Sequence, residues 1–436
     1  MKNVNMKLIP FISPLLIVLS FQTYSLGQSK IIGHAIKVEV KESGNKFQLF
    51  RDGEPYYLKG AGGGLDEIAS LAKHGGNSIR TWSTHNSRAI LDSAETYGLT
   101  VLMGLHVERE RHGFDYNDNE AIQEQLLRIR SEIEKYKNHP ALLAWGIGNE
   151  LNLNYSNKKV WNAVEEIAEM IHEIDGNHPV TTMLAGIAKD EVDYIKENCK
   201  SLDFLSVQMY ADVINVRQRI KEAGWDGPYA ITEWGATGHW EVAKTGWGAA
   251  IEQTSTERAK TVKERYEKAI ALDTTQCLGS YVFLWGQKQE RTPTWYGLFL
   301  ESGEEMESID VMQYLWTGQW PANRAPRIED ITLEGKTRYQ NIWLRPGEEV
   351  NLKFHAFDLE NDPLQINAEL LPESTDLGEG GDFEKRPKTI HGLIRSDLPG
   401  SIFFLSPKEA GAYRIFVYVR DGNNNAATAN VPFYVE

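Results

Sequence analysis

Short apolar runs alternate with amphipathic segments along the chain from residue 56 to residue 285. Each run has the composition of a buried strand, and most are followed by a segment with helical periodicity. The runs that predict strands are 56–64, 75–82, 99–107, 141–150, 179–184, 204–210, 229–233 and 278–285. The segments that predict helices are 65–74, 89–97, 120–136, 160–174, 190–197, 216–223 and 256–272. This alternation predicts an α/β fold, a closed parallel (β/α)₈ TIM barrel with its site at the carboxyl ends of the strands.

Two of the predicted strands end in a glutamate. The run from Ala141 leads through Gly148 and Asn149 to Glu150, and the run from Tyr229 leads to Glu233. Taken alone, Glu150 could be a helix cap or a surface-turn residue as readily as a catalytic one. Because the strand ends of one parallel barrel share a face, we expect both carboxyl groups at one site. Such a pair suits acid and nucleophile chemistry on a glycosidic bond.

The amino-terminal segment has the features of a secretory signal peptide. Lys2 and Lys7 precede an apolar stretch that ends near Phe21, and small residues precede Gln28. We therefore expect residues 1–27 to be removed, and the product to be secreted or periplasmic without stable membrane insertion. The net charge of −15 argues against a nucleic-acid partner and favours a neutral polysaccharide or oligosaccharide. We expect a monomer.

The chain changes character after Trp316. We expect residues 28–320 to form the barrel domain, opened by a hairpin, with 321–327 as a Pro-containing linker. Residues 328–436 show short alternating strands and turns, which predict an all-β immunoglobulin-like sandwich. The acidic turn from Asp358 to Asp362 leaves two interpretations open, a calcium site or a solvated turn without an ion.

The cysteines and histidines argue against a required catalytic metal, and we expect no cofactor. No histidine pair or cysteine cluster has metal-ligand spacing. Cys199 and Cys277 each precede a predicted barrel strand. There a small buried hydrophobe is a better interpretation than a disulfide, although export would permit the disulfide.

The Gly148-Asn149-Glu150 and Thr232-Glu233-Trp234 motifs, on the fourth and seventh strands, resemble those of the retaining glycoside hydrolases of clan A. The resemblance implies that Glu150 is the acid/base and Glu233 the nucleophile. It also implies that Asn149 contacts the substrate's 2-hydroxyl and that Trp285 floors the sugar site. In the same way, Arg80 and Tyr210 would position the nucleophile. A neighbouring cation and hydroxyl would keep a nucleophilic carboxylate ionised.

Further polar and aromatic residues follow the strand ends. His106 ends the third strand, and an acidic and basic cluster after it, residues 108–111, is interpreted as solvated ion pairs. Glu241 is a further candidate for substrate contact. The loops after strands two, seven and eight carry aromatic residues suited to stacking on sugar faces, namely Trp82, Trp240, Trp247 and Trp295.

Several stacking platforms indicate a cleft along a polymer. A barrel followed by one immunoglobulin-like domain, after a signal peptide, is similar to the endo-β-1,3-glucanases of glycoside hydrolase family 158. We therefore expect a secreted endo-β-1,3-glucanase. Three alternatives stay open: an exo-acting β-glycosidase of family 2 type, a β-glucan transglycosylase, and a non-catalytic polysaccharide-binding protein.

Overall fold

The computed structural model describes Met1 and residues 34–398 and 400–436. Apart from Met1, the predicted signal peptide lies outside the described residues. Within these ranges no helix combines the length and the hydropathy that crossing a membrane requires.

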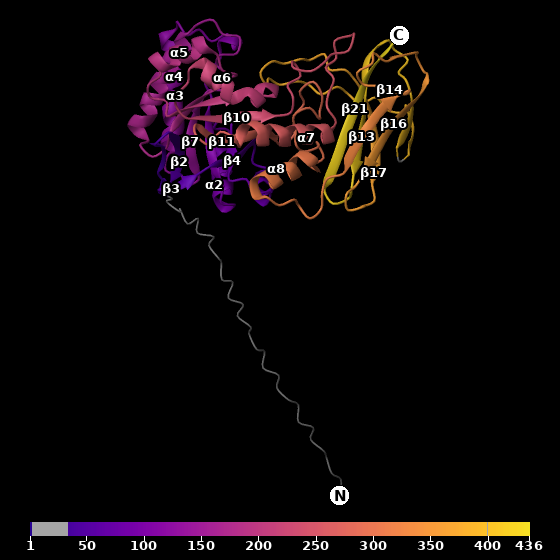
Figure 1. Ribbon diagram of the computed structural model, residues 1–436, viewed down its shortest axis with the longest axis horizontal. Helices are drawn as coiled ribbons and strands as arrows, with labels where there is room; N and C mark the ends of the chain where they lie inside the picture. Colours follow the sequence, from indigo (N-terminus) through magenta and orange to yellow (C-terminus); the bar gives the residue numbers. More distant parts are fainter. Residues whose placement is uncertain (2–33, 399) are drawn as a thin grey trace. The chain divides into compact units, whose positions relative to one another are not determined.

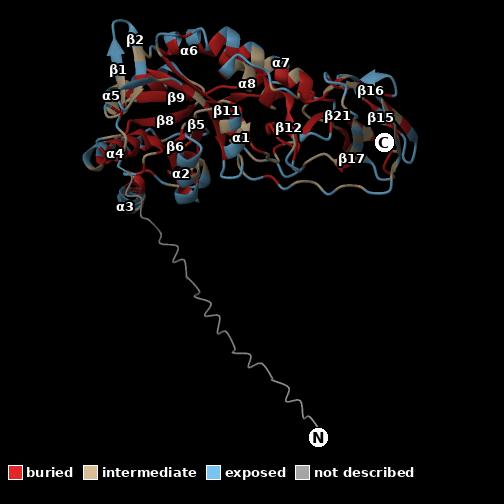
Figure 2. Ribbon diagram, turned by 90° about the horizontal axis from the view of Figure 1, so that it is seen from below, coloured by how far each residue is buried: buried red, intermediate tan, exposed pale blue. Residues whose placement is uncertain are grey.

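The predicted barrel is confirmed. Eight parallel strands close on themselves in the order β10-β11-β4-β5-β6-β7-β8-β9. Their bounds are β4 Leu58–Gly63, β5 Ser78–Arg80, β6 Thr100–Leu105, β7 Leu142–Ile147, β8 Val180–Ala185, β9 Phe204–Gln208, β10 Tyr229–Gly235 and β11 Cys277–Trp285. The strands are almost wholly buried, whereas the surrounding helices have exposed outer faces (Figure 2). Burial on both sides explains why these runs are apolar without alternation.

Helices surround the strands, as Figure 1 shows. Their bounds are α1 Ile68–Lys73, α2 Ser87–Thr96, α3 Asn119–Tyr136, α4 Lys159–Ile174, α5 Lys189–Asn198, α6 Val216–Ala223, α7 Ser255–Arg265 and α8 Glu307–Thr317. The Asp118 side chain caps α3, and Thr254 with Glu257 forms a capping box on α7. The predicted helix 256–272 is divided, because the backbone changes to a π-helical turn over Tyr266–Ile270. None of the predicted helices corresponds to α8.

A small antiparallel sheet precedes the barrel. It consists of β1 Val38–Ser43, β2 Lys46–Arg51 and β3 Glu54–Tyr56. Val38 and Leu49 pack in one cluster with interior barrel residues such as Leu102 and Phe204. This sheet therefore fills the end of the barrel where the strands begin, and leaves the opposite end for a site.

The carboxyl-terminal strands form a sandwich of two sheets. One sheet has the order β12-β21-β20-β17 with β15 beside β21, and the other has the order β14-β13-β16-β19-β18. The bounds are β12 Glu305–Met306, β13 Arg327–Leu333, β14 Lys336–Thr337, β15 Trp343–Leu344, β16 Glu349–Phe357, β17 Gln365–Pro372, β18 Ile394–Leu398, β19 Ser401–Leu405, β20 Gly411–Arg420 and β21 Asn425–Val435. Side chains from both sheets, including Leu352, Phe404, Ile415 and Val431, form one buried core. This is the arrangement that alternating strands predict.

The sandwich packs directly on the barrel domain. Helix α7 contacts β13 and β21, and α8 contacts β21. The backbone N–H of Ile328 donates to the Thr256 hydroxyl over 3.0 Å, and the Asn430 amide donates to Glu252 over 2.7 Å. The short strand β12, from the segment expected to belong to the barrel, pairs with β21. The two domains thus share a sheet as well as side-chain contacts.

Candidate active site

Glu233 lies at the carboxyl end of β10 and is held by three donors. Arg80 donates to its Oε1 over 2.6 Å, and the Trp82 indole N–H donates to the same oxygen over 2.8 Å. The Tyr210 hydroxyl donates to Oε2 over 2.9 Å. Only 5% of Glu233 is exposed, so a cation and two further donors compensate a nearly buried carboxylate.

Arg80 also joins Glu233 to Asn149. The second guanidinium nitrogen of the fully buried Arg80 donates to the Asn149 side-chain oxygen over 2.5 Å, and Gln208 donates to that oxygen over 2.7 Å. Both donors occupy the oxygen of the amide. No described residue accepts a hydrogen bond from its NH₂ group, and Asn149 lines a cavity, so this group is available to donate to a bound ligand.

Glu150 follows β7 in a left-handed backbone conformation, with φ of 51°. Burial, and next the negative charge of Glu233, raise the pKa of the Glu150 carboxyl to about 8. Glu150 therefore carries a proton at neutral pH. The structure thus places a carboxyl group that can donate a proton beside a carboxylate paired with an arginine.

Both glutamates line one cavity of about 360 Å³. Its wall includes Trp82, Asn149, Tyr210, Trp240, Phe283 and Tyr296, so aromatic rings form much of it. A second cavity of about 650 Å³ is lined by Glu150, Tyr210, Trp240 and Glu241, among others, but not by Glu233. The two cavities therefore share Glu150 and differ in their access to Glu233.

The sandwich contributes one wall of this site. Residues 373–393 form a long loop between β17 and β18, which we call the 373–393 loop, and Gly380 and Gly381 within it line the smaller cavity. Asp382 anchors the loop to the barrel through ion pairs with Arg111 over 2.7 Å and with His112 over 3.1 Å. Asn154, Lys288 and Arg291 of the barrel domain also bond to this loop. The site is complete only when both domains are present.

Some aromatic residues predicted at the site are there, and others are not. Trp82 lines the smaller cavity, and the 56% exposed Trp240 lines both cavities. Trp295 packs behind Tyr296 and donates to the Thr237 carbonyl, so it supports the wall without lining it. Trp247 instead contacts Trp343 and Tyr434 of the sandwich, because its loop packs at the junction of the domains.

The structure corrects two predicted strand-end residues. Trp285 is fully buried beneath the helices and stacks on Trp316 at 5.6 Å, and Phe283 lines the cavity instead. A register irregularity between Val282 and Trp285 interrupts the alternation of β11, which turns Trp285 to the outer face. His106 is exposed, lies 3.3 Å from Glu108 and lines neither cavity.

The cluster that follows the third strand is also not a solvated set of ion pairs. Arg109 lines the smaller cavity and donates to the Asn149 carbonyl over 3.1 Å. The Arg111 side chain is only 7% exposed because Asp382 covers it. Other parts of the site were not predicted from the sequence, namely Phe283, Gln208 and the glycines of the 373–393 loop. A polar residue ending the sixth strand was a signal for Gln208, but no local signal marked the loop.

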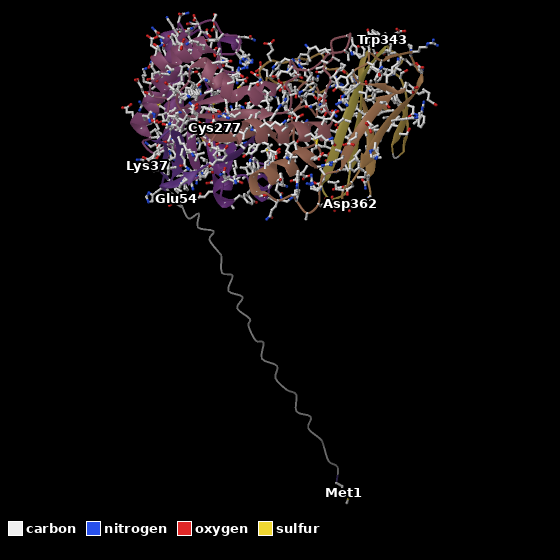
Figure 3. The ribbon with its side chains drawn as sticks, viewed as in Figure 1. Met1, Lys37, Glu54, Cys277, Trp343 and Asp362 are labelled. Atoms are coloured by element: carbon white, nitrogen blue, oxygen red, sulfur yellow. The ribbon has the colours of Figure 1, made fainter. Side chains whose placement is uncertain are left out.

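The remaining candidate residues either make hydrogen bonds that support the fold or lie outside the two cavities. The Glu241 carboxylate lines the larger cavity and accepts the N–H groups of Ala211 and Gly238. Cys199 and Cys277 are both free and buried, and Cys277 lies within the barrel (Figure 3).

Among the described residues, two groups have the geometry of a metal site, Asp92 with Glu95 and His139, and Asp358 with Asp362 and Asp421. Neither group lines the two cavities.

Most of the barrel matches the model of a known protein family. Residues 65–259 match the family model described as glycosyl hydrolases family 2, TIM barrel domain. The match covers most of the barrel but less than half of the chain, so it shows that this part resembles a glycosyl hydrolase barrel. The family 158 relationship that the sequence suggested is not supported by this match.

Solved structures share the fold of this chain. A β-D-glucuronidase of Dictyoglomus thermophilum is 20% identical, with a TM-score of 0.51 over 65% of this chain and 54% of that protein. A putative β-galactosidase from Bacteroides fragilis is 14% identical, with a TM-score of 0.51 over 92% of this chain and 57% of that protein. This chain thus spans little more than half the length of either protein.

Proposed function

We propose that this protein is a retaining, exo-acting β-glycosidase, with Glu233 as the nucleophile and Glu150 as the acid/base. The observation that carries the proposal is that both carboxyl groups line one cavity while their surroundings differ. Arg80 compensates the charge of Glu233, whereas burial and Glu233 keep a proton on Glu150. Two carboxyl groups with such opposed surroundings can share the two roles that retention requires.

In the first step the Glu233 carboxylate attacks the anomeric carbon, and the bond from that carbon to the leaving oxygen breaks. Glu150 transfers its proton to that oxygen, which leaves a glycosyl ester on Glu233 and an ionised Glu150. In the second step water attacks the anomeric carbon and gives a proton to Glu150. The ester bond to Glu233 breaks, and the sugar leaves with its original β configuration.

The two cavities support exo action. The acid must contact the leaving oxygen, which lies between the sugar that reacts and its leaving group, whereas the nucleophile contacts only the sugar. Glu150 lines both cavities and Glu233 lines only the smaller one. We therefore assign the reacting sugar to the 360 Å³ cavity and the leaving group to the 650 Å³ cavity. The 373–393 loop covers part of the sugar cavity, which leaves less room for a polymer to continue past it.

The family 2 match favours this alternative over the endo-β-1,3-glucanase that the sequence analysis expected. The names of the structural neighbours suggest glucuronides and galactosides as the first sugars to test. Export through residues 1–27 is part of the proposal, and amino-terminal sequencing of the mature protein tests it.

The experiment is a panel of p-nitrophenyl β-glycosides, including glucuronide, galactoside and glucoside, with laminarin alongside. We expect release of single sugars, and proton NMR should detect the β anomer first. Glu233→Gln should abolish turnover without changing the circular dichroism spectrum. Glu108→Gln, which lies outside the cavities, should retain turnover. Oligosaccharides appearing first from laminarin would contradict exo action, and a first-formed α anomer would contradict retention. No hydrolysis at all, with retained polysaccharide binding, would favour the non-catalytic alternative.

A further inference from the structure

Three carboxylates converge in the sandwich, away from the cavities of the active site. Asp358 and Asp362 belong to the turn after β16, and Asp421 begins the turn between β20 and β21. We call these residues the acidic cluster. One oxygen from each of the three lies within 4.8 Å of the others. Figure 3 shows Asp362 at the opposite end of the sandwich from Trp343.

Two of the three residues of the acidic cluster are buried, and no described cation compensates the carboxylates. Asp358 is 8% exposed and Asp421 is 4% exposed. Within the described ranges no lysine, arginine or histidine forms an ion pair with any of the three carboxylates. Arg324, close to them in the linker, pairs instead with Asp310 over 3.4 Å. Three negative charges held this close without a counter-charge are costly, so a bound cation would stabilise them.

The hydrogen bonds of Asp358 provide an independent indication of a ligand. Its Oδ1 accepts the backbone N–H groups of Glu360 and Asp362, each over 2.9 Å. Its Oδ2 is buried and has no hydrogen-bond partner. Buried polar atoms are normally satisfied, and this unsatisfied one belongs to a carboxyl group that lies beside two other carboxylates.

Amide groups hold the other two carboxylates in place. The side chains of Asn323 and Asn423 donate to Asp362 Oδ2 over 2.6 and 2.8 Å. Asn425 donates to Asp421 Oδ2 over 2.9 Å. Such donors orient the carboxylates without neutralising them, as the outer partners of metal ligands do.

We propose that the acidic cluster binds one Ca²⁺ ion at the junction of the two domains. Ca²⁺ takes six to eight oxygen ligands at about 2.3–2.6 Å, so oxygens on opposite sides of the ion lie roughly 4.6–5.2 Å apart. The cluster satisfies this limit, and the partly exposed Asp362 leaves room for water ligands and a route of entry. Mg²⁺ requires stricter octahedral geometry and retains its waters, so it suits this set of three carboxylates less well.

Calcium here would join the two domains. Asn323 belongs to the linker after α8, and Asn425 pairs in register with Glu305 of β12. An ion held by the two turns would therefore fix the linker and the shared sheet at the same point. This role is independent of the proposed glycosidase activity.

The test uses the full chain, stripped of metal with EDTA and titrated with CaCl₂ in a calorimeter. We expect one ion per chain, and a rise in Tm of roughly 3–8 °C at a calcium concentration about 100 times the Kd. Asp358→Asn and Asp421→Asn keep the Oδ1 acceptor but remove charge, so they should abolish both effects. Glu409→Gln, an exposed carboxylate of the same domain, is the matched control and should behave as the wild type.

Calorimetry of the wild type decides the proposal even if the aspartate variants fold poorly. The absence of calcium binding and of a Tm shift would overturn it. Unchanged binding in folded Asp358→Asn and Asp421→Asn would also overturn it, because the ion would then lie elsewhere. An equal Tm shift with MgCl₂ at the same concentration would overturn the assignment to calcium.

Discussion

Replacing Glu150 with glutamine tests the proposed division of roles most directly. The raised pKa of about 8 means that roughly 90% of Glu150 is protonated at pH 7 and roughly 10% at pH 9. If Glu150 is the acid, kcat/KM of the wild type should fall about tenfold between these pH values. Glutamine cannot titrate, so Glu150→Gln should lose this alkaline limb.

The size of the loss should depend on the leaving group. An alkyl glycoside needs protonation as its bond breaks, so Glu150→Gln should lower its kcat/KM by about 10²–10⁴. A 2,4-dinitrophenyl glycoside of the same sugar departs without a proton, so its kcat/KM should change by less than about tenfold. Its kcat should fall, because no base activates water in the second step, and azide should restore it by attacking the glycosyl ester.

The assay is initial-rate kinetics with both glycosides from pH 5 to pH 9.5, with Glu108→Gln as the matched control. Glu108 is a partly exposed carboxylate that lines neither cavity, and its substitution should leave both substrates unaffected. Equal losses for the two leaving groups, or an alkaline limb that persists in Glu150→Gln, would refute the assignment of Glu150 as the acid/base.

Three further predictions concern the surroundings of the glutamates. Tyr210→Phe removes the 2.9 Å hydrogen bond to Glu233. A hydrogen bond to a charged group contributes about 1.5–3 kcal/mol, so kcat/KM should fall at least tenfold. An unchanged kcat/KM would show that Tyr210 does not position Glu233. Asp382→Ala cuts the ion pairs that anchor the 373–393 loop, so KM for an aryl glycoside should rise severalfold, and an unaltered KM would show that the loop does not shape the sugar cavity. Phe283→Ala should raise KM in steady-state assays, whereas Trp285→Ala should leave KM unchanged and cost about 3–5 kcal/mol of unfolding free energy, measured by urea denaturation. A raised KM for Trp285→Ala together with an unchanged KM for Phe283→Ala would contradict the orientation of these two side chains on β11.

Much of the barrel was predictable because its information is local. A buried parallel strand must be apolar along its whole length, and the covering helix must be amphipathic, so both leave a pattern in adjacent residues. The polar residues that end these strands are equally visible, and closure of the barrel places them at one face. Arg80, Asn149, Tyr210 and Glu233 lie together for this reason.

Other features depended on contacts between distant residues. The family resemblance implied that Trp285 floors the sugar site, but a register irregularity of β11 against β4 turns this residue outward. Arg111 resembles a solvated surface arginine in the sequence, and only the docking of Asp382 from the other domain buries it. Trp247 is suited to sugar stacking by its chemistry, yet the packing of the domains places it against Trp343.

The sequence by itself determined which segments become strands, and therefore which side chains can reach the open end of the barrel. Only the tertiary structure decided that a loop of the sandwich closes part of the site and that Glu150 lines two cavities. The physical reason is that strand and helix patterns arise from the burial of neighbouring residues. The shape of the site depends instead on how two separately folded surfaces pack against each other, and no local pattern encodes that packing.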